Sequence, residues 1–260
     1  MISEQKIKES FKKEYIKDVY VYDTLDSTNS EAKRQLPELL GGGFLAPRIL
    51  VAREQTAGRG RLGRSFYSPK KKGIYMSFLY FHERPIKDTV TVTVSSAVAV
   101  AKAIERISGK DMRIKWVNDI YDDSGKVCGI LTEAVPFGSF TAVIIGVGIN
   151  VGKSEFPEEL RAIASSVEEL EGKENELIAA IAEGLAEQAD TGDGGFIEEY
   201  RKRFMLEGAH VDLLRAGERV SSGKVLGVND DGALIFLPDG ESEEIIISSG
   251  EVSVRNYEKE

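Results

Sequence analysis

The chain has 260 residues, 42% hydrophobic and 30% charged, with no apolar run long enough to span a membrane and an N-terminus too charged for a signal peptide. Its formal net charge of −9 argues against general nucleic-acid binding. One cysteine, Cys128, and two histidines exclude an internal disulfide, disfavour a transition-metal site and favour a reducing cytoplasm.

The N-terminal part of the chain reads as a strand, a helix and a second strand. β-branched and aromatic residues predict a strand at residues 19–22. Thr28 and Glu31 fit a capping box, which predicts a helix that ends at the glycines of residues 41–43. Residues 48–53 then read as the second strand.

Residues 58–64 read Gly-Arg-Gly-Arg-Leu-Gly-Arg, which suits neither a helix interior nor a strand. The spacing satisfies G-x-G-x-x-G, but an expected strand on each side (48–53 and 73–81) is the wrong context for a dinucleotide-binding motif. Residues 53–72 hold seven basic residues and one acid, so their net charge is +6 and the rest of the chain carries −15. A solvated loop would also have this composition, but the interleaved glycines favour a loop that closes over a small anionic ligand.

The central part of the chain combines one long helix with several strands. Small and apolar residues at helical spacing predict a buried helix at residues 89–107. Apolar runs predict strands at residues 73–81, 112–117, 127–134 and 140–150. The run at 140–150 shows no alternation, so we expect it at the centre of the sheet. Residues 158–204 read as largely helical, with breaks around Gly172 and at residues 191–195.

After residue 208 the pattern changes to short strands separated by glycine turns. These strands are expected at residues 211–214, 219–228, 233–237, 244–247 and 252–255. Five short strands in about fifty residues favour a small barrel. We therefore place a domain boundary near Glu207, between residues 1–207 and 208–260.

Polar and charged side chains gather at strand ends, and each group alone has a structural explanation. Capping accounts for Ser27, Thr28 and Asn29, and Lys115 and Lys126 read equally well as strand-edge lysines. Their order along the chain is more informative. It runs through residues 27–29 (Ser-Thr-Asn), 54–61 (Glu-Gln-Thr-Ala-Gly-Arg-Gly-Arg), 115–119 (Lys-Trp-Val-Asn-Asp), 126–133 (Lys-Val-Cys-Gly-Ile-Leu-Thr-Glu) and 146–150 (Gly-Val-Gly-Ile-Asn). In this order the motifs resemble those of biotin–protein ligases, and the resemblance covers nearly the whole chain.

The resemblance implies a fold and an activity. The fold would be α+β, with a central mixed β-sheet flanked by helices in a class II synthetase-like catalytic domain and an SH3-like β-barrel at residues 208–260. The activity would be the ATP-dependent conversion of biotin to biotinyl-5′-AMP and transfer of biotin to a lysine of a biotin carboxyl carrier domain of a carboxylase. Mg²⁺ would enter with ATP. The resemblance implies no nucleic-acid or membrane partner, and leaves open a monomer or a homodimer.

The resemblance also assigns site residues. Catalytic positions are Lys126 and Arg61, which would offset the charge of the reacting carboxylate and phosphate, and Asp119, which would act as the base toward the acceptor lysine. Biotin-binding positions are Ser27, Thr28, Asn29, Gln55, Gly58, Arg59, Gly60, Arg61, Lys126 and Gly129. ATP- or adenylate-binding positions are Arg61, Arg64, Phe66, Lys115, Trp116, Asn118, Lys126 and Asn150. No residue is assigned to a metal.

The chain departs from the family pattern in three places. Val117 stands where proline is usual, which removes the backbone restriction on the preceding residue. Phe66 stands where many relatives have tryptophan, so a stacking face remains and the indole donor is lost. Only about eighteen residues precede the first expected strand, too few for a helix-turn-helix domain. We therefore expect a monofunctional ligase.

Two other functions remain as alternatives. A lipoate- or octanoate-protein ligase or transferase resembles this fold, and the glycines of residues 41–43 are similar to that group's triple glycine. The expected helix end at these glycines already gives them a structural reason. A non-catalytic biotin-binding sensor is the second alternative, and the presence of Arg61, Lys126 and Asp119 together argues against it.

Overall fold

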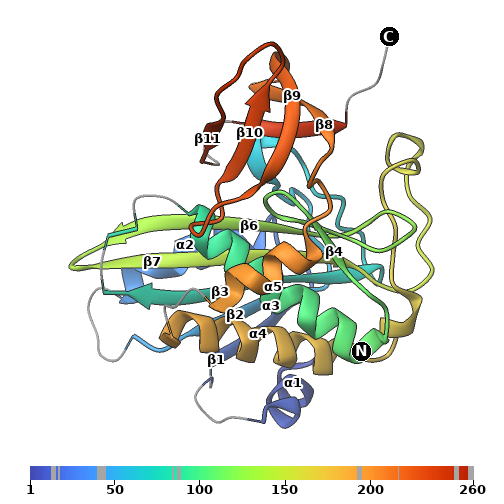
Figure 1. Cartoon of the computed structure of the whole chain (residues 1–260). Coiled ribbons are helices and arrows are strands. Elements are labelled where there is room, and N and C mark those ends of the chain that lie inside the picture. Colours follow the sequence, from blue (N-terminus) through green and yellow to red (C-terminus); the bar gives the residue numbers. More distant parts are fainter. Residues whose placement is uncertain are drawn as a thin grey trace.

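The computed structural model contains a seven-stranded mixed sheet with helices on both faces and a five-stranded antiparallel sheet beside it (Figure 1). It describes residues 1–12, 16, 18–39, 45–83, 85–86, 89–191, 195–215, 217–248 and 252–256. The glycines of residues 41–43, where we expect the end of a helix, lie outside the described residues.

The larger sheet has the strand order β1-β2-β3-β7-β6-β5-β4. Only β1 and β2 pair in parallel, and every other neighbouring pair is antiparallel. Its strands are β1 (Asp18–Tyr22), β2 (Arg48–Ala52), β3 (Gly73–His82), β4 (Arg113–Lys115), β5 (Asp119–Tyr121), β6 (Lys126–Phe137) and β7 (Phe140–Asn150). The expected strands are confirmed, including the central position of β7.

Two long helices cover one face of this sheet. They are α3 (Val90–Ser108) and α4 (Glu174–Thr191), and α1 (Glu4–Ser10) and α5 (Gly195–Arg203) lie at their sides. Alternate residues of the central strands, such as Met76 and Val147, share one buried core with α3 and α4. The side chains between them point to the opposite face, because successive residues of a strand alternate in direction.

The helix α2 (Thr28–Leu39) covers part of that opposite face. Its Ala32 and Leu36 pack on Leu50, Leu79 and Ile144 in a second, smaller core. Beyond α2 the strands carry glycines and polar residues on this face. The sheet therefore has one fully covered face and one face that is covered at one end only.

The C-terminal sheet has the strand order β11-β10-β9-β8-β12. Its strands are β8 (His210–Arg215), β9 (Glu218–Val228), β10 (Leu234–Pro238), β11 (Ile245–Ile247) and β12 (Val252–Asn256). Val211, Val225, Leu234 and Phe236 form its buried side. The pairing leaves β11 and β12 at opposite ends, so this sheet is an open form of the expected small barrel. The fold is α+β, as the resemblance implies.

The expected helix is wrong for the first part of residues 158–204. Residues 158–172 form no α-helix but two short 3₁₀ turns, Glu158–Leu160 and Glu168–Leu170. The backbone between them pairs with the sheet, since Ala164 bridges Lys126 and Val167 bridges Val151. Helical spacing of apolar residues in this short segment is overridden by the backbone hydrogen bonds that the ends of β6 and β7 offer.

Candidate functional site

A cavity of about 620 Å³ opens on the partly covered face of the large sheet. Among the predicted site residues, only Gly58 is absent from its lining. The others that line it are Ser27, Thr28, Asn29, Gln55, Arg59, Gly60, Arg61, Arg64, Phe66, Lys115, Trp116, Asn118, Asp119, Lys126, Gly129 and Asn150. A second hollow, of about 1060 Å³, lies between α3 and α4 and contains none of the predicted residues.

Glycines of β6 and β7 form the floor of the cavity. Gly129 pairs with Gly148 across the two strands, so both face the same side of the sheet. A Cβ on Gly148 would overlap the ring of Phe66, and a Cβ on Gly146 would overlap the side-chain oxygen of Asn29. The two glycines in the motif of residues 146–150 therefore make room for side chains that pack on the sheet from above.

The polar end of the cavity lies at the start of α2. The backbone N–H and the hydroxyl of Thr28 donate to Gln55 Oε1 at 2.9 and 3.3 Å, and Gln55 Nε2 donates to Ser68 Oγ at 3.0 Å. The capping-box expectation is wrong, because Glu31 N donates to the carbonyl of Ser27 and α2 already begins at Thr28. The tertiary partner Gln55 takes the hydroxyl that local capping would have used.

Glu133 holds together a partly buried polar cluster beside this end. Its carboxylate pairs with Lys33 at 2.7 Å and Arg59 at 3.2 Å, and it accepts a hydrogen bond from Asn29 Nδ2 at 3.0 Å. Burial alone would raise the pKa of Glu133, but the hydrogen bonds from Lys33 and Asn29 and the charge of Arg59 outweigh it, so the pKa is lowered. The guanidinium of Arg59 is thus tied to a carboxylate at the edge of the cavity.

Sequence reasoning missed the roles of Glu133 and Ser77 in this cluster. Ser77 is fully buried on β3 and donates to Asn29 Oδ1 at 2.6 Å. Glu133 is the last residue of the motif at residues 126–133, and its place in that motif could have marked it as a site residue. Ser77 sits inside an apolar strand, where only the polar residue itself marks the position.

The glycine-arginine loop is a compact turn above the floor. Phe66 N donates to the carbonyl of Gly58 at 2.9 Å, and Gly60 N donates to the carbonyl of Arg64 at 2.7 Å. A Cβ on Gly58 would overlap the carbonyl of Phe66, so this glycine is needed where the two arms of the loop meet. The loop is flanked by strands, which confirms that the dinucleotide-binding interpretation does not apply.

The charged centre of the cavity combines the loop with the β5–β6 hairpin. Lys126 Nζ lies 2.7 Å from Asp119 Oδ1, and both side chains are about one-quarter exposed (27% and 25%). Arg61 Nη1 donates to Asn118 Oδ1 at 3.3 Å. Asn118 is oriented in turn by its Nδ2, which donates to the carbonyl of Ile130 at 2.8 Å. The three predicted catalytic residues therefore line one cavity.

Two of the predicted nucleotide-side residues have structural partners. Asn150 Nδ2 donates to the carbonyls of Ser165 and Lys126 at 2.9 and 3.4 Å, so it supports the backbone that carries Lys126. Trp116 is 5% exposed, and its Nε1 donates to the carbonyl of Gly232 in the C-terminal sheet at 3.0 Å. The Trp116–Val117 peptide bond is cis.

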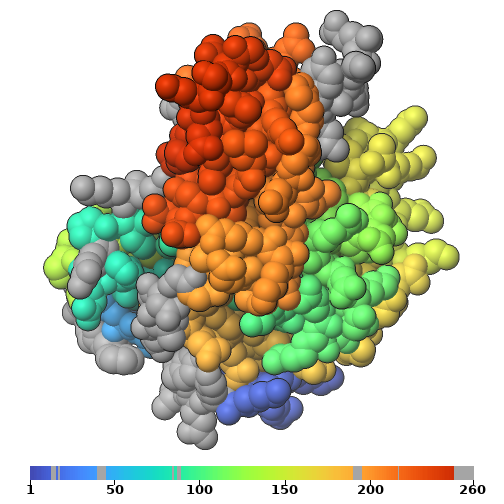
Figure 2. All heavy atoms as spheres, viewed as in Figure 1, coloured from blue at the N-terminus to red at the C-terminus, as the bar shows by residue number. Residues whose placement is uncertain are grey.

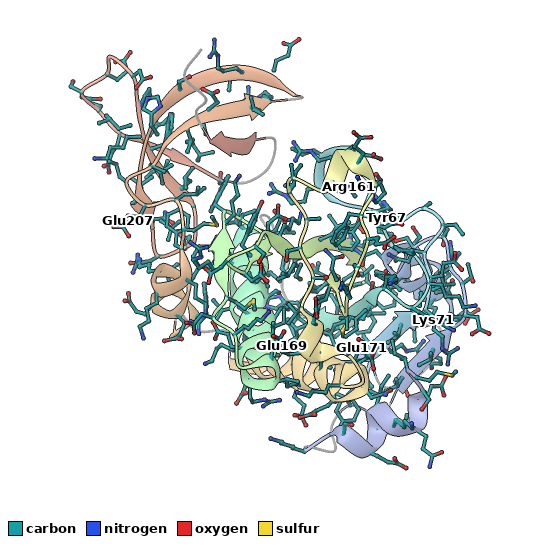
Figure 3. All side chains as sticks on the ribbon, turned by 90° about the vertical axis from the view of Figure 1, so that its right-hand side faces the viewer. Tyr67, Lys71, Arg161, Glu169, Glu171 and Glu207 are labelled. Carbon is teal, nitrogen blue, oxygen red and sulfur yellow. The ribbon has the colours of Figure 1, made fainter. Side chains whose placement is uncertain are left out.

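The mouth of the cavity carries apolar side chains that the sequence did not point to. Leu62, Tyr67 and Ile163 line it and are 47%, 41% and 52% exposed. Ile163 belongs to the segment that we expected to be helical. Tyr67, which lines the cavity, lies at the same end of the larger sheet as Arg161 in Figure 3. Leu214, on β8, adds one side chain from the C-terminal sheet to the lining.

This arrangement suits a reaction between anionic groups. Arg61, Arg64 and Lys126 line one cavity, so their positive charges can offset those of anionic groups that bind there. Asp119 lies in the same centre and can accept a proton from an incoming nucleophile. Among the described residues, no group of three or more His, Cys, Asp or Glu side chains is placed to hold a metal ion.

Both parts of the chain match known protein families. Residues 25–150 match the model of the biotin/lipoate A/B protein ligase family, and residues 208–255 match that of the biotin protein ligase C-terminal domain. The chain is similar to a bifunctional ligase/repressor from Bacillus subtilis, with 33% identity over 90% of this chain and 74% of the relative. A biotin–[acetyl-CoA-carboxylase] ligase from Paracoccus denitrificans is 31% identical over 81% of this chain and 90% of its own length.

The fold is similar to that of a solved ligand complex. The biotin protein ligase from Aquifex aeolicus in complex with biotin and ATP superposes with a TM-score of 0.73 at 30% identity. The match covers 93% of this chain and 100% of that one. Both the sheet that bears the cavity and the C-terminal sheet therefore have counterparts in that structure.

Proposed function

The chain belongs to the biotin/lipoate A/B protein ligase family, and from this premise we infer that it is an ATP-dependent biotin–protein ligase. It activates biotin with ATP to biotinyl-5′-AMP and transfers biotin to a lysine of a carboxylase's biotin carboxyl carrier domain. The observation that supports this function most directly is that Arg61, Lys126 and Asp119 line the same cavity, above the glycines of β6 and β7. The match of residues 208–255 to a biotin protein ligase domain favours biotin over lipoate.

We assign the first chemical step to Lys126 and Arg61. The biotin carboxylate must approach the α-phosphate of ATP, and two unit charges about 4 Å apart repel by about 4 kcal/mol at an effective dielectric near 20. Lys126 would neutralise the reacting oxygens, and Arg61 would hold the adenylate under the loop. Mg²⁺ would arrive as part of the ATP substrate, bound mostly by phosphates and water.

We assign the second step to Asp119. The acceptor lysine must lose a proton before its amine attacks the acyl carbon of the adenylate, and the Asp119 carboxylate, 2.7 Å from Lys126 Nζ, would accept that proton. Ser27, Thr28, Gln55 and the backbone near Gly129 are our proposed biotin contacts. Phe66, Arg64 and Asn118 are our proposed contacts to the nucleotide.

Several further properties belong to the same proposal. We propose that residues 1–207 bind biotin and ATP and that residues 208–260 form a second domain. None of the helices in the described part of the chain is long and apolar enough to cross a membrane. We propose a cytoplasmic enzyme that, at a net charge of −9, does not bind nucleic acid.

The test of this function is pyrophosphate release by the purified protein. We expect release when biotin and ATP are both present and none when lipoate replaces biotin. Release with lipoate and ATP, but not with biotin and ATP, would favour the lipoate alternative. Biotin binding without any pyrophosphate release would favour a non-catalytic sensor.

A further inference from the structure

The turn between β9 and β10 is a fixed contact point of the C-terminal sheet. Asn229 Oδ1 accepts hydrogen bonds from the N–H groups of Asp231 and Ala233 at 3.1 and 2.8 Å, and Gly232 N donates to the carbonyl of Asn229 at 3.0 Å. Gly232 has φ +83°, a conformation that costs a residue with a side chain. The turn therefore holds the carbonyl of Gly232 in one direction.

Two of the helices that cover the seven-stranded sheet, α3 and α5, anchor this turn. Thr91 Oγ1 of α3 donates to the carbonyl of Asp231 at 3.1 Å. The guanidinium of Arg201, on α5, donates to the carbonyl of Val228 at 3.1 Å and to Asp230 Oδ1 at 2.7 Å. Figure 2 shows the C-terminal sheet lying directly against α5.

Gly232 is closely packed as well as held in a left-handed conformation. A Cβ at this position would lie 2.7 Å from Val94 Cγ2 of α3, so no larger residue fits without movement. This close approach brings the Gly232 carbonyl within 3.0 Å of Trp116 Nε1, in a buried hydrogen bond. The C-terminal sheet thus reaches a residue that lines the cavity.

Trp116 starts the turn that carries the reactive side chains. It precedes Asn118, which accepts from Arg61, and Asp119, which pairs with Lys126. This β4–β5 hairpin lies at the edge of the sheet and is joined to β6 through three residue pairs. A small shift of the hairpin would therefore move Asn118 and Asp119 away from their partners.

We propose that Gly232 is a positioning residue for the ligase reaction, acting through the hydrogen bond from Trp116 to hold Asn118 and Asp119 against Arg61 and Lys126. The proposal rests on the function inferred above. It makes the C-terminal sheet a support for the reactive hairpin. The proposed biotin contacts on α2 and at Gln55 lie on other elements and should not depend on it.

A pair of glycine variants separates this role from a general loss of stability. Gly232 and Gly240 have nearly the same φ, +83° and +81°, but a Cβ on Gly240 would meet nothing within 4 Å. Gly232→Ala and Gly240→Ala therefore both place a side chain at a positive φ, with a similar free-energy cost. Only Gly232→Ala also displaces the turn. A double variant, Gly232→Ala with Val94→Ala, removes the two methyl groups nearest to the added Cβ.

The readouts are the single-turnover rates of adenylate formation and transfer, and the Kd for biotin. We expect Gly232→Ala to slow the chemistry by about 10- to 100-fold, as displacements of about 1 Å do, with an unchanged biotin Kd. Gly240→Ala should keep the wild-type rates, and the double variant should regain most of the lost rate.

Three outcomes would overturn the proposal: wild-type rates in Gly232→Ala, an equal loss in Gly240→Ala, or a loss explained by weaker biotin binding. If Gly232→Ala fails to fold, recovery of folding but not of rate in the double variant would also overturn it. These outcomes differ from a failure of the proposed function, in which the wild-type protein itself would release no pyrophosphate with biotin and ATP.

Discussion

Lys126 Nζ lies 2.7 Å from Asp119 Oδ1, so the proposed catalytic cation and the proposed base are ion-paired in the cavity. They come from neighbouring strands, β6 and β5, joined by the short turn at residues 122–125. The pair holds each side chain in place. When biotin and ATP bind, the reacting oxygens would compete with Asp119 for the Lys126 ammonium, and the carboxylate would be released for the second step.

Replacing Lys126 by alanine should abolish most of the first step. We expect Lys126→Ala to lower the rate of adenylate formation by about 10²- to 10³-fold, the cost of removing one group that stabilises transition-state charge. The measurement is pyrophosphate release with biotin and ATP, with circular dichroism to check the fold. Lys153→Ala, which changes an exposed lysine outside the cavity lining, is the matched control. Near-normal release by Lys126→Ala would contradict the role.

Replacing Asp119 by asparagine should separate the two steps. We expect Asp119→Asn to spare adenylate formation and to slow transfer to the carrier lysine by about 10²- to 10⁴-fold, the range of general-base catalysis. Single-turnover assays of each half-reaction give the two rates. Equal losses in both would mean that Asp119 serves only to position Lys126.

Replacing Arg61 by glycine should release the intermediate. Hydrogen bonds to charged groups contribute about 1.5–3 kcal/mol, so biotinyl-5′-AMP should leave Arg61→Gly about 10- to 100-fold faster. The free adenylate would biotinylate bystander lysines, which mass spectrometry of added albumin would detect. Leu62→Gly, in the same loop, is the control because it adds flexibility and keeps the guanidinium. A strictly specific Arg61→Gly enzyme would count against the retention role.

The lowered pKa of Glu133 predicts a pH-dependent contribution to stability. A depressed carboxyl pKa stabilises the folded state above the unfolded value, near 4.5, and this stabilisation is lost as the pH falls through the lower folded value. Glu133→Gln should reduce the free energy of unfolding at pH 7 by about 1–3 kcal/mol and flatten its decline below pH 4.5. Urea titrations at several pH values test this, with the exposed Glu244→Gln as control. A parallel decline in Glu133→Gln and the wild type would refute the link.

Much of the fold follows from local patterns in the sequence. Strands such as β7 and the long helix α3 have apolar runs that favour one structure strongly, and their bounds lie close to those expected. Residues 158–172 were mispredicted because their hydrogen-bond partners lie on distant strands. The start of α2 was misassigned for a similar reason, since Gln55 takes the Thr28 hydroxyl.

The site was predictable as a set of residues but not as a set of contacts. All but one of the residues that the resemblance assigns to the site line the cavity, yet the motifs gave no sign that Arg59 pairs with Glu133 or that Trp116 donates to Gly232. Both partners are far away in the sequence. Sequence spacing constrains neighbours within an element, whereas these contacts depend on how separate elements pack.

The central claim is that this protein attaches biotin to a carrier lysine. The direct test is to incubate it with labelled biotin, ATP and a purified biotin carboxyl carrier domain from the same organism, and to map the modified residue by mass spectrometry. We expect label on one lysine of the carrier, dependent on ATP and lost in Lys126→Ala. No incorporation of biotin, or incorporation of lipoate in its place, would contradict the claim.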